Sequence, residues 1–136
     1  MLSKVYLKIH DFECPIEDIN NALGLLPTKS WVKGDVINES KALIVRKNSV
    51  WQIESNVSEQ APVEEHIKFM LDLITVKSTL LKQFTRKYES ELTIVSKCNK
   101  NEEFNYGFFI DIESLTLISD VGLSIDMDIY FIPKLE

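Results

Sequence analysis

The chain has 136 residues and a formal net charge of −6, with 45% hydrophobic and 26% charged residues. These values are ordinary for a soluble globular protein, so we expect a single domain over residues 1–136 and no extensive disorder. Nucleic-acid binders present basic surfaces, so the acidic balance argues against a nucleic-acid partner. It favours a basic protein partner, which long-range electrostatic attraction would steer.

The first third of the chain predicts a strand, a short helix and a loop. Apolar and polar residues alternate over residues 4–12, which is typical of a half-buried strand. In the run CPIEDINNALG, Pro15 suits the first position of a helix and Gly24 suits the residue that ends it. We expect a loop over residues 25–35, because Pro27 and the turn residues after it interrupt both the helical and the strand periodicity.

The middle of the chain predicts a hairpin and a long helix. The runs KALIVRK and VWQIES indicate strands over residues 41–46 and 50–55, joined as a hairpin through the dipeptide NS. Pro62 then opens the longest helix, which continues to Tyr88 with apolar residues at helical spacing. Acidic residues at its start and basic residues at its end complement the helix dipole. We expect this helix to lie across a sheet as the main core element.

The last third predicts three strands and a short helix. ELTIVSKC and YGFFIDI are expected strands, and a helix capped by Ser114 and ended by Gly122 follows them. In the final strand, SIDMDIYF, Asp126, Asp128 and Tyr130 alternate with apolar residues. The order β-α-β-β-α-β-β-α-β predicts an α+β fold. We expect a single mostly antiparallel sheet of about six strands, with helices packed on one face and a ferredoxin-like beginning.

The same residues resemble a known family. The shared features are the run ALGLLPT followed by Gly34 and Asp35, Trp51 on a strand, VEEHIKFML in the long helix, and the C-terminal run LISDVGLSIDMDIYF. From Val5 to Phe131 the chain is similar to the domain of unknown function 4279 family of small, mostly bacterial proteins. The resemblance implies an α+β fold without an established activity or assigned catalytic residues. Some small bacterial domains of this size neutralise toxins, and this analogy suggests an immunity-like role.

Recognised catalytic, metal and nucleotide motifs are missing from the sequence. Cys14 and Cys98 form no CxxC pair, and the four glycines match no phosphate-binding loop. The N-terminus does not read as a signal peptide and the apolar runs are too short to span a bilayer, so we expect a cytoplasmic protein without membrane contact. We therefore expect no cofactor and no metal, and a non-enzymatic protein-binding module is favoured over an enzyme.

Trp31 is the leading candidate binding residue because no period fixes the direction of its ring. Either the ring pins its loop to the body, or it forms a binding lip with Lys33 and Asp35. A second hypothesis is a small-molecule-binding domain or small enzyme. Its pocket would lie between the Trp31 loop and the long helix, where His66 would line it.

Asp126, Asp128 and Tyr130 share one face of the last strand. The paired aspartates could hold a divalent cation or share a proton, or the three residues belong to a solvated sheet face or to a surface that contacts a partner. A homodimer formed through an uncovered edge or face of the sheet is a third alternative.

Overall fold

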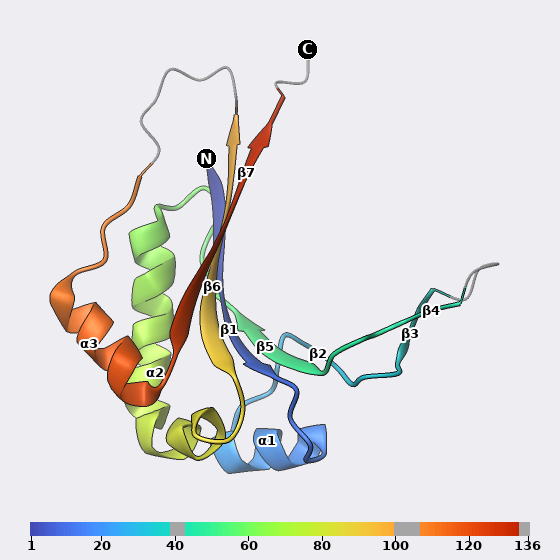
Figure 1. Ribbon diagram of the computed structural model, residues 1–136. Helices are drawn as coiled ribbons and strands as arrows, with labels where there is room; N and C mark the ends of the chain where they lie inside the picture. The colour runs from blue at the N-terminus through green and yellow to red at the C-terminus, as the bar shows by residue number, and fades with distance from the viewer. Residues whose placement is uncertain (39–42, 100–106, 134–136) are drawn as a thin grey trace.

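The computed structural model describes residues 1–38, 43–99 and 107–133. Within these residues the chain has an α+β fold with three helices, a mostly antiparallel five-stranded sheet and a separate two-stranded sheet (Figure 1). The elements in chain order are β1 (Leu2–His10), α1 (Ile16–Leu23), β2 (Lys29–Trp31), β3 (Val36–Asn38), β4 (Ile44–Val45), β5 (Val50–Glu54), α2 (Val63–Thr85), β6 (Ser90–Asn99), α3 (Ile112–Val121) and β7 (Ser124–Ile132).

The large sheet has the strand order β2-β5-β1-β6-β7. Its central strand β1 is antiparallel to both β5 and β6, and β5 is also antiparallel to β2. β1 and β2 are therefore parallel with β5 between them, which is the arrangement of a split β-α-β unit. β7 lies parallel to β6 at the far edge, and the connection between these two strands contains α3.

The helices cover one side of this sheet. Val5, Leu7 and Ile9 of β1 are fully buried beneath them, while the residues between these three point to the opposite side. α2 lies against β1, and α1 and α3 pack against α2 (Figure 1). We call the other side of the sheet the open face.

α2 is one unbroken helix, as its sequence predicts, and it lies within the expected range 62–88. Pro62 occupies the N-cap rather than the first turn, and the helix ends at a C-cap on Arg86. Its buried residues recur at helical spacing and face the sheet: Val63, His66, Ile67, Met70, Ile74 and Leu81.

Trp51 ties α1 to the sheet. Its side chain is fully buried, and its indole Nε1 donates a hydrogen bond of 2.8 Å to Oδ1 of Asn20. Ile19 and Leu23 of the same helix enter the same hydrophobic core. Gly24 ends α1 in the left-handed conformation, as predicted.

The predicted hairpin between residues 41–46 and 50–55 is wrong. Of the first run, residues 41 and 42 lie outside the described residues, and Ile44–Val45 pairs with Val36–Asn38 rather than with β5. β5 instead lies between β1 and β2. The expected turn fails because Ser49 is held elsewhere, since its hydroxyl accepts the Lys33 N–H at 2.9 Å.

Three further expectations need correction. The predicted loop 25–35 contains the short strand β2, which the sequence pattern misses because three residues are too few to show a period. The predicted strand YGFFIDI begins at Tyr106, outside the described residues, and residues 107–111 form no strand. The cap of α3 is Asp111, whose carboxylate accepts the N–H of Ser114 at 2.7 Å, rather than Ser114 itself. The described strands therefore form a five-stranded and a two-stranded sheet, in the order β-α-β-β-β-β-α-β-α-β.

Gly122 ends α3 at a point where a larger residue has no room. Its φ is +86°, and a Cβ atom added there would lie 2.9 Å from Oγ1 of Thr85. That hydroxyl is fixed, because it donates a 2.7 Å hydrogen bond to the carbonyl of Val121. Gly24 is a matched cap with φ +65°, where a Cβ would lie 3.4 Å from the flexible end of Lys77.

We therefore predict that Gly24→Ala lowers the free energy of unfolding by about 1 kcal/mol, the cost of a left-handed alanine. Gly122→Ala should lower it by at least about 1 kcal/mol more, because overpacking adds to the backbone strain. Urea denaturation of both variants measures the difference. Equal losses would contradict the contact between Gly122 and Thr85.

Candidate functional site

The open face carries polar side chains from the middle and one edge of the sheet. In the pairing register, Thr93 lies opposite Asp126, and Val95 lies opposite Asp128. On β1 the open face presents Tyr6, flanked by lysines, and His10 at the end of the strand. Because strand residues alternate between faces, this surface lies on the side away from α2.

β3 and β4 form a two-stranded arm that projects beside the open face (Figure 1). We call residues 32–38 and 43–48 the arm. Its base is closed by two backbone hydrogen bonds of 2.8 Å, from Gly34 N–H to the carbonyl of Arg46 and from Arg46 N–H to the carbonyl of Asp35. The Asp35 carboxylate also accepts the N–H of Val32 at 2.8 Å. The base of the arm is therefore held firmly by its own backbone.

Trp31 joins the arm to the sheet. It lies opposite Val50 in the pairing of β2 with β5, so its half-buried ring faces the open side. The guanidinium of Arg46 lies over this ring, 4.0 Å from its centroid. This cation–π contact holds the end of β4 against β2.

A groove of about 360 Å³ opens between the arm and the sheet. We call it the arm groove. Its sheet side is formed by His10, Trp31 and Val50, and its arm side includes Ile37, Ile44 and Val45. The three arm residues are 40–50% exposed, so the groove presents apolar surface to solvent. Arg46 and Lys47 add positive charge to the same wall.

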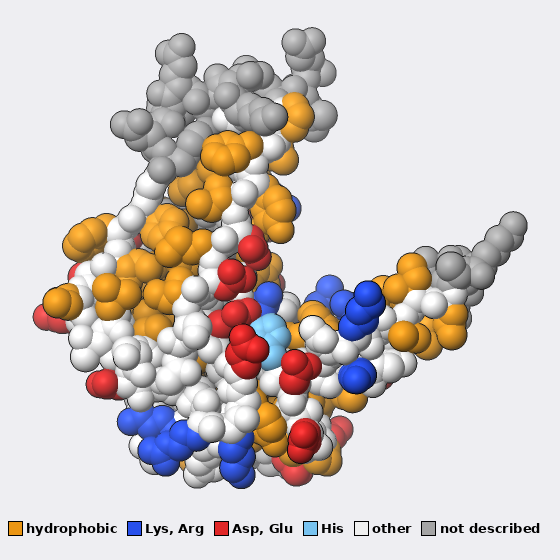
Figure 2. Space-filling model, viewed as in Figure 1, with side chains coloured by type: hydrophobic (Ala, Val, Ile, Leu, Met, Phe, Trp, Pro, Cys, Tyr) orange, Lys and Arg blue, Asp and Glu red, His pale blue; other side chains and the backbone are white. Residues whose placement is uncertain are grey.

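Acidic side chains dominate the open face beyond the groove. His10 Nε2 lies 2.8 Å from Oε1 of Glu91, and the hydroxyl of Thr93 donates to the same oxygen at 3.2 Å. Asp126 and Asp128 follow on the neighbouring strand β7. Figure 2 shows acidic side chains gathered around a histidine on this face, with lysines and arginines near the base of the arm. The surface is therefore divided into an acidic part and a basic part.

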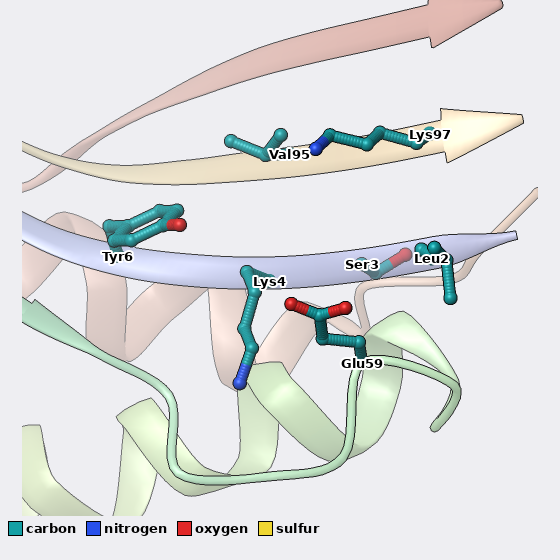
Figure 3. A pocket seen from close by; sticks show the side chains of 7 residues that line it. All are labelled: Leu2, Ser3, Lys4, Tyr6, Glu59, Val95 and Lys97. Carbon is teal, nitrogen blue, oxygen red and sulfur yellow. The ribbon is translucent and has the colours of Figure 1, made fainter. Parts of the chain in front are cut away.

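A smaller cavity of about 100 Å³ lies near the start of β1, over β1 and β6 and beside the loop that carries Glu59 (Figure 3). The ammonium group of Lys4, which lines this cavity, has a structural role. It donates hydrogen bonds to the carbonyls of Ser55 at 3.2 Å and Val57 at 2.9 Å. Burial, followed by the charge of Glu54, raises the pKa of Tyr6 above its ordinary value, so the phenol stays protonated at neutral pH. These groups hold the loop after β5 against β1.

His66 lies on the opposite side of the sheet, fully buried in α2. Its Nδ1 is 2.6 Å from the hydroxyl of Ser55, which also accepts the N–H of Val5 at 3.1 Å. Burial lowers the pKa of His66, and the backbone of Ser58 opposes that shift only in part. The imidazole is therefore neutral and links α2 to the end of β5 and to β1.

The predicted binding residues do not form one cluster. Trp31 lines the arm groove, and Lys33 lies at the base of the arm, where its N–H donates to the hydroxyl of Ser49. Asp126, Asp128 and Tyr130 lie on β7, at the opposite edge of the sheet from β2. The sheet separates His66 from all of them.

Sequence reasoning missed the arm groove apart from Trp31, and the clearest examples are Ile44 and Arg46. Ile44 and Arg46 belong to a run predicted to pair with β5, so they were expected in the body of the sheet. Their position depends on the pairing of β4 with β3, which is spread over two short segments and leaves no period to detect.

Among the residues that the structure describes, no group of three or more His, Cys, Asp or Glu side chains is placed to hold a metal ion. The same part of the chain contains no helix that is both long and apolar enough to cross a membrane.

The fold and the site together define a small α+β domain whose open sheet face is extended by a protruding arm. A family model described as a domain of unknown function (DUF4279) matches residues 1–132, and the chain belongs to this family. Neither a curated protein nor a solved structure matches the chain.

The lowered pKa of His66 predicts how stability depends on pH. Below the ordinary value of 6.5, the unfolded chain takes up a proton that the folded chain resists. The stability contributed by neutral His66 is therefore fully present above pH 6.5 and is lost as the pH falls toward the folded pKa. Urea midpoints measured above and below pH 6.5 should show this loss in the natural protein.

His66→Asn keeps an acceptor for Ser55 but removes the titrating group, so it should flatten this dependence. His10→Asn is the control, because His10 lies half-buried on the opposite face and its replacement leaves the contribution of His66 in place. An unchanged pH dependence in His66→Asn would show that another group is responsible.

Proposed function

We propose that this chain is a non-enzymatic protein-binding module that holds a segment of its partner in the arm groove. The observation that carries the proposal is the exposed apolar surface of the arm at Ile37, Ile44 and Val45. Exposed apolar surface beside a groove is typical of sites that bind another molecule.

The small size of the arm supports this interpretation. β3 has three residues and β4 has two, and an isolated two-stranded sheet is at best marginally stable in water. The arm keeps its apolar side chains exposed while its base is closed by hydrogen bonds and the Trp31–Arg46 contact. A partner segment in the groove would bury these side chains and Trp31 together, and aromatic residues are frequent anchors in such interfaces.

The charges of the surface suggest the chemistry of the partner. Glu91, Asp126 and Asp128 form an acidic area beyond the groove and would attract basic residues. Arg46 and Lys47 on the arm side would attract acidic or carbonyl groups of the same partner. A basic protein that offers an apolar segment fits both areas, and a toxin neutralised by an immunity-like protein is one partner of this kind.

A small molecule is the second candidate occupant. The groove volume of about 360 Å³ lies in the range of ligand pockets, and Trp31 with Arg46 would suit a flat anionic ligand. A small molecule bound in the arm groove would lie on the open face rather than beside α2, where the sequence-based hypothesis placed the pocket. The wide apolar arm favours the protein segment, because a small ligand would leave most of the arm uncovered.

We predict that Ile44→Asp and Trp31→Ala each weaken partner binding about thirtyfold, a loss of about 2 kcal/mol for a central interface residue. The immobilised chain would be incubated with lysate of its source organism, and the captured protein would be identified and titrated. Val76→Asp is the control, because Val76 is 78% exposed on α2, on the helix side of the sheet.

Binding that survives Ile44→Asp would exclude the arm groove as the site. If the purified chain captures no protein and a small anionic metabolite raises its melting temperature, the second candidate is correct. The metabolite effect should then disappear in Trp31→Ala and persist in Val76→Asp.

The acidic area predicts a second outcome. Binding to a basic partner should weaken as the salt concentration rises, because screening reduces the attraction. The double variant Asp126→Asn with Asp128→Asn should bind more weakly at low salt and show a smaller salt dependence. Asp120→Asn removes an exposed charge on α3 and should leave the salt dependence unchanged. Salt-insensitive binding by the natural protein would rule out the electrostatic part of the proposal.

A further inference from the structure

β7 forms an outer edge of the large sheet (Figure 1). It pairs with β6 in an unbroken parallel register over nine residues, from Ser124 to Ile132. Within residues 1–38, 43–99 and 107–133, no strand pairs with its other side. A strand edge of this length offers a row of backbone donors and acceptors for another strand.

β7 also lacks most of the features by which proteins protect such edges, and its charged side chains are limited to Asp126 and Asp128. The run SIDMDIYFI contains no lysine, arginine or proline, and its register shows no bulge. Pro133 follows only after the strand has ended. Lysine, proline and bulges are among the features that keep natural edges unpaired, so their absence leaves the edge of β7 more suited to pairing.

An apolar row accompanies this edge. Met127, Ile129 and Phe131 are 50%, 51% and 57% exposed, although they share a face with buried residues of β6. Their direct neighbours on that strand are Ile94, Ser96 and Cys98, all at most 2% exposed. Figure 2 shows hydrophobic side chains gathered around this half of β7. The edge therefore combines free backbone groups with apolar side chains.

We propose that β7 pairs antiparallel with β7 of a second copy of this chain, about a two-fold axis through Ile129. The two sheets then become one continuous sheet. In this register Ile129 lies opposite itself, and Met127 lies opposite Phe131 of the second copy. Cross-strand apolar and aromatic pairs of this kind stabilise antiparallel sheets. The proposal does not rest on the proposed function, because β7 and the arm lie at opposite edges of the sheet.

The charges of β7 select this register. An axis through Asp126 or Asp128 would place a carboxylate opposite itself, and an axis through Met127 would place Asp126 opposite Asp128. Like charges directly opposite each other destabilise a sheet. With the axis at Ile129, each Asp128 lies opposite the phenol of Tyr130, which can donate a hydrogen bond to it. Axes farther along the strand leave fewer residues paired.

Light scattering of the full chain over a range of concentrations should show a dimer. Ile129→Lys places two ammonium groups opposite each other and should give a monomer, while Val76→Lys, at an exposed position on α2, should remain dimeric. A chain that is monomeric at every concentration, or a dimer that persists in Ile129→Lys, would overturn the proposal. A monomer whose binding to a different protein is lost in Ile129→Lys would assign the edge to that protein and overturn it equally.

Cysteine cross-linking tests the register itself. In a Cys14→Ser background, which removes the half-buried native thiol, Ile129→Cys should form a disulfide-linked dimer on oxidation. Opposite Cα atoms in antiparallel strands are about 4.5–5.5 Å apart, within disulfide range. Met127→Cys is the matched control on the same face, because its copies would lie about 13 Å apart, four residues along the strand. Equal cross-linking of both variants would contradict the axis at Ile129.

Discussion

The packing of α2 on β1 is the constraint on which the rest of the structure depends. The helix buries Val5, Leu7 and Ile9 of β1. Because side chains alternate along a strand, the residues between these three point away from α2. Because the large sheet is hydrogen-bonded into one layer, this choice of faces extends to β5, β6 and β7. The acidic residues of β7 and the ring of Trp31 reach the open face for the same reason.

Sequence periodicity identified the long elements well. β1, α2 and β7 are long enough for their alternation or helical spacing to be read directly, and the glycine caps of α1 and α3 were recognised from residue type. The helical spacing of α2 also indicates on which side of the helix His66 lies, because His66 follows Val63 by three residues and precedes Met70 by four. Both of those residues are buried, so the histidine belongs to the buried side of the helix.

The arm groove was beyond the reach of periodicity. Its walls come from His10, Trp31 and Ile44, three residues on segments far apart in the sequence. β2, β3 and β4 have only two or three residues each, and the β3–β4 arm is closed by hydrogen bonds at Gly34, Asp35 and Arg46 that no hydrophobic pattern marks. Sequence reasoning singled out Trp31 as a candidate binding residue, but the contact of its ring with Arg46 became visible only in three dimensions.

The position of β2 and β7 at opposite edges of the sheet has a consequence for valency. If two copies join through β7, the ten strands of the combined sheet carry one arm at each end. Nine strand spacings separate the two β2 strands, about 43 Å at about 4.8 Å each. Such an assembly would present two equivalent grooves to a repetitive or dimeric target. Avidity would then strengthen its hold on that target without any new contact within either groove.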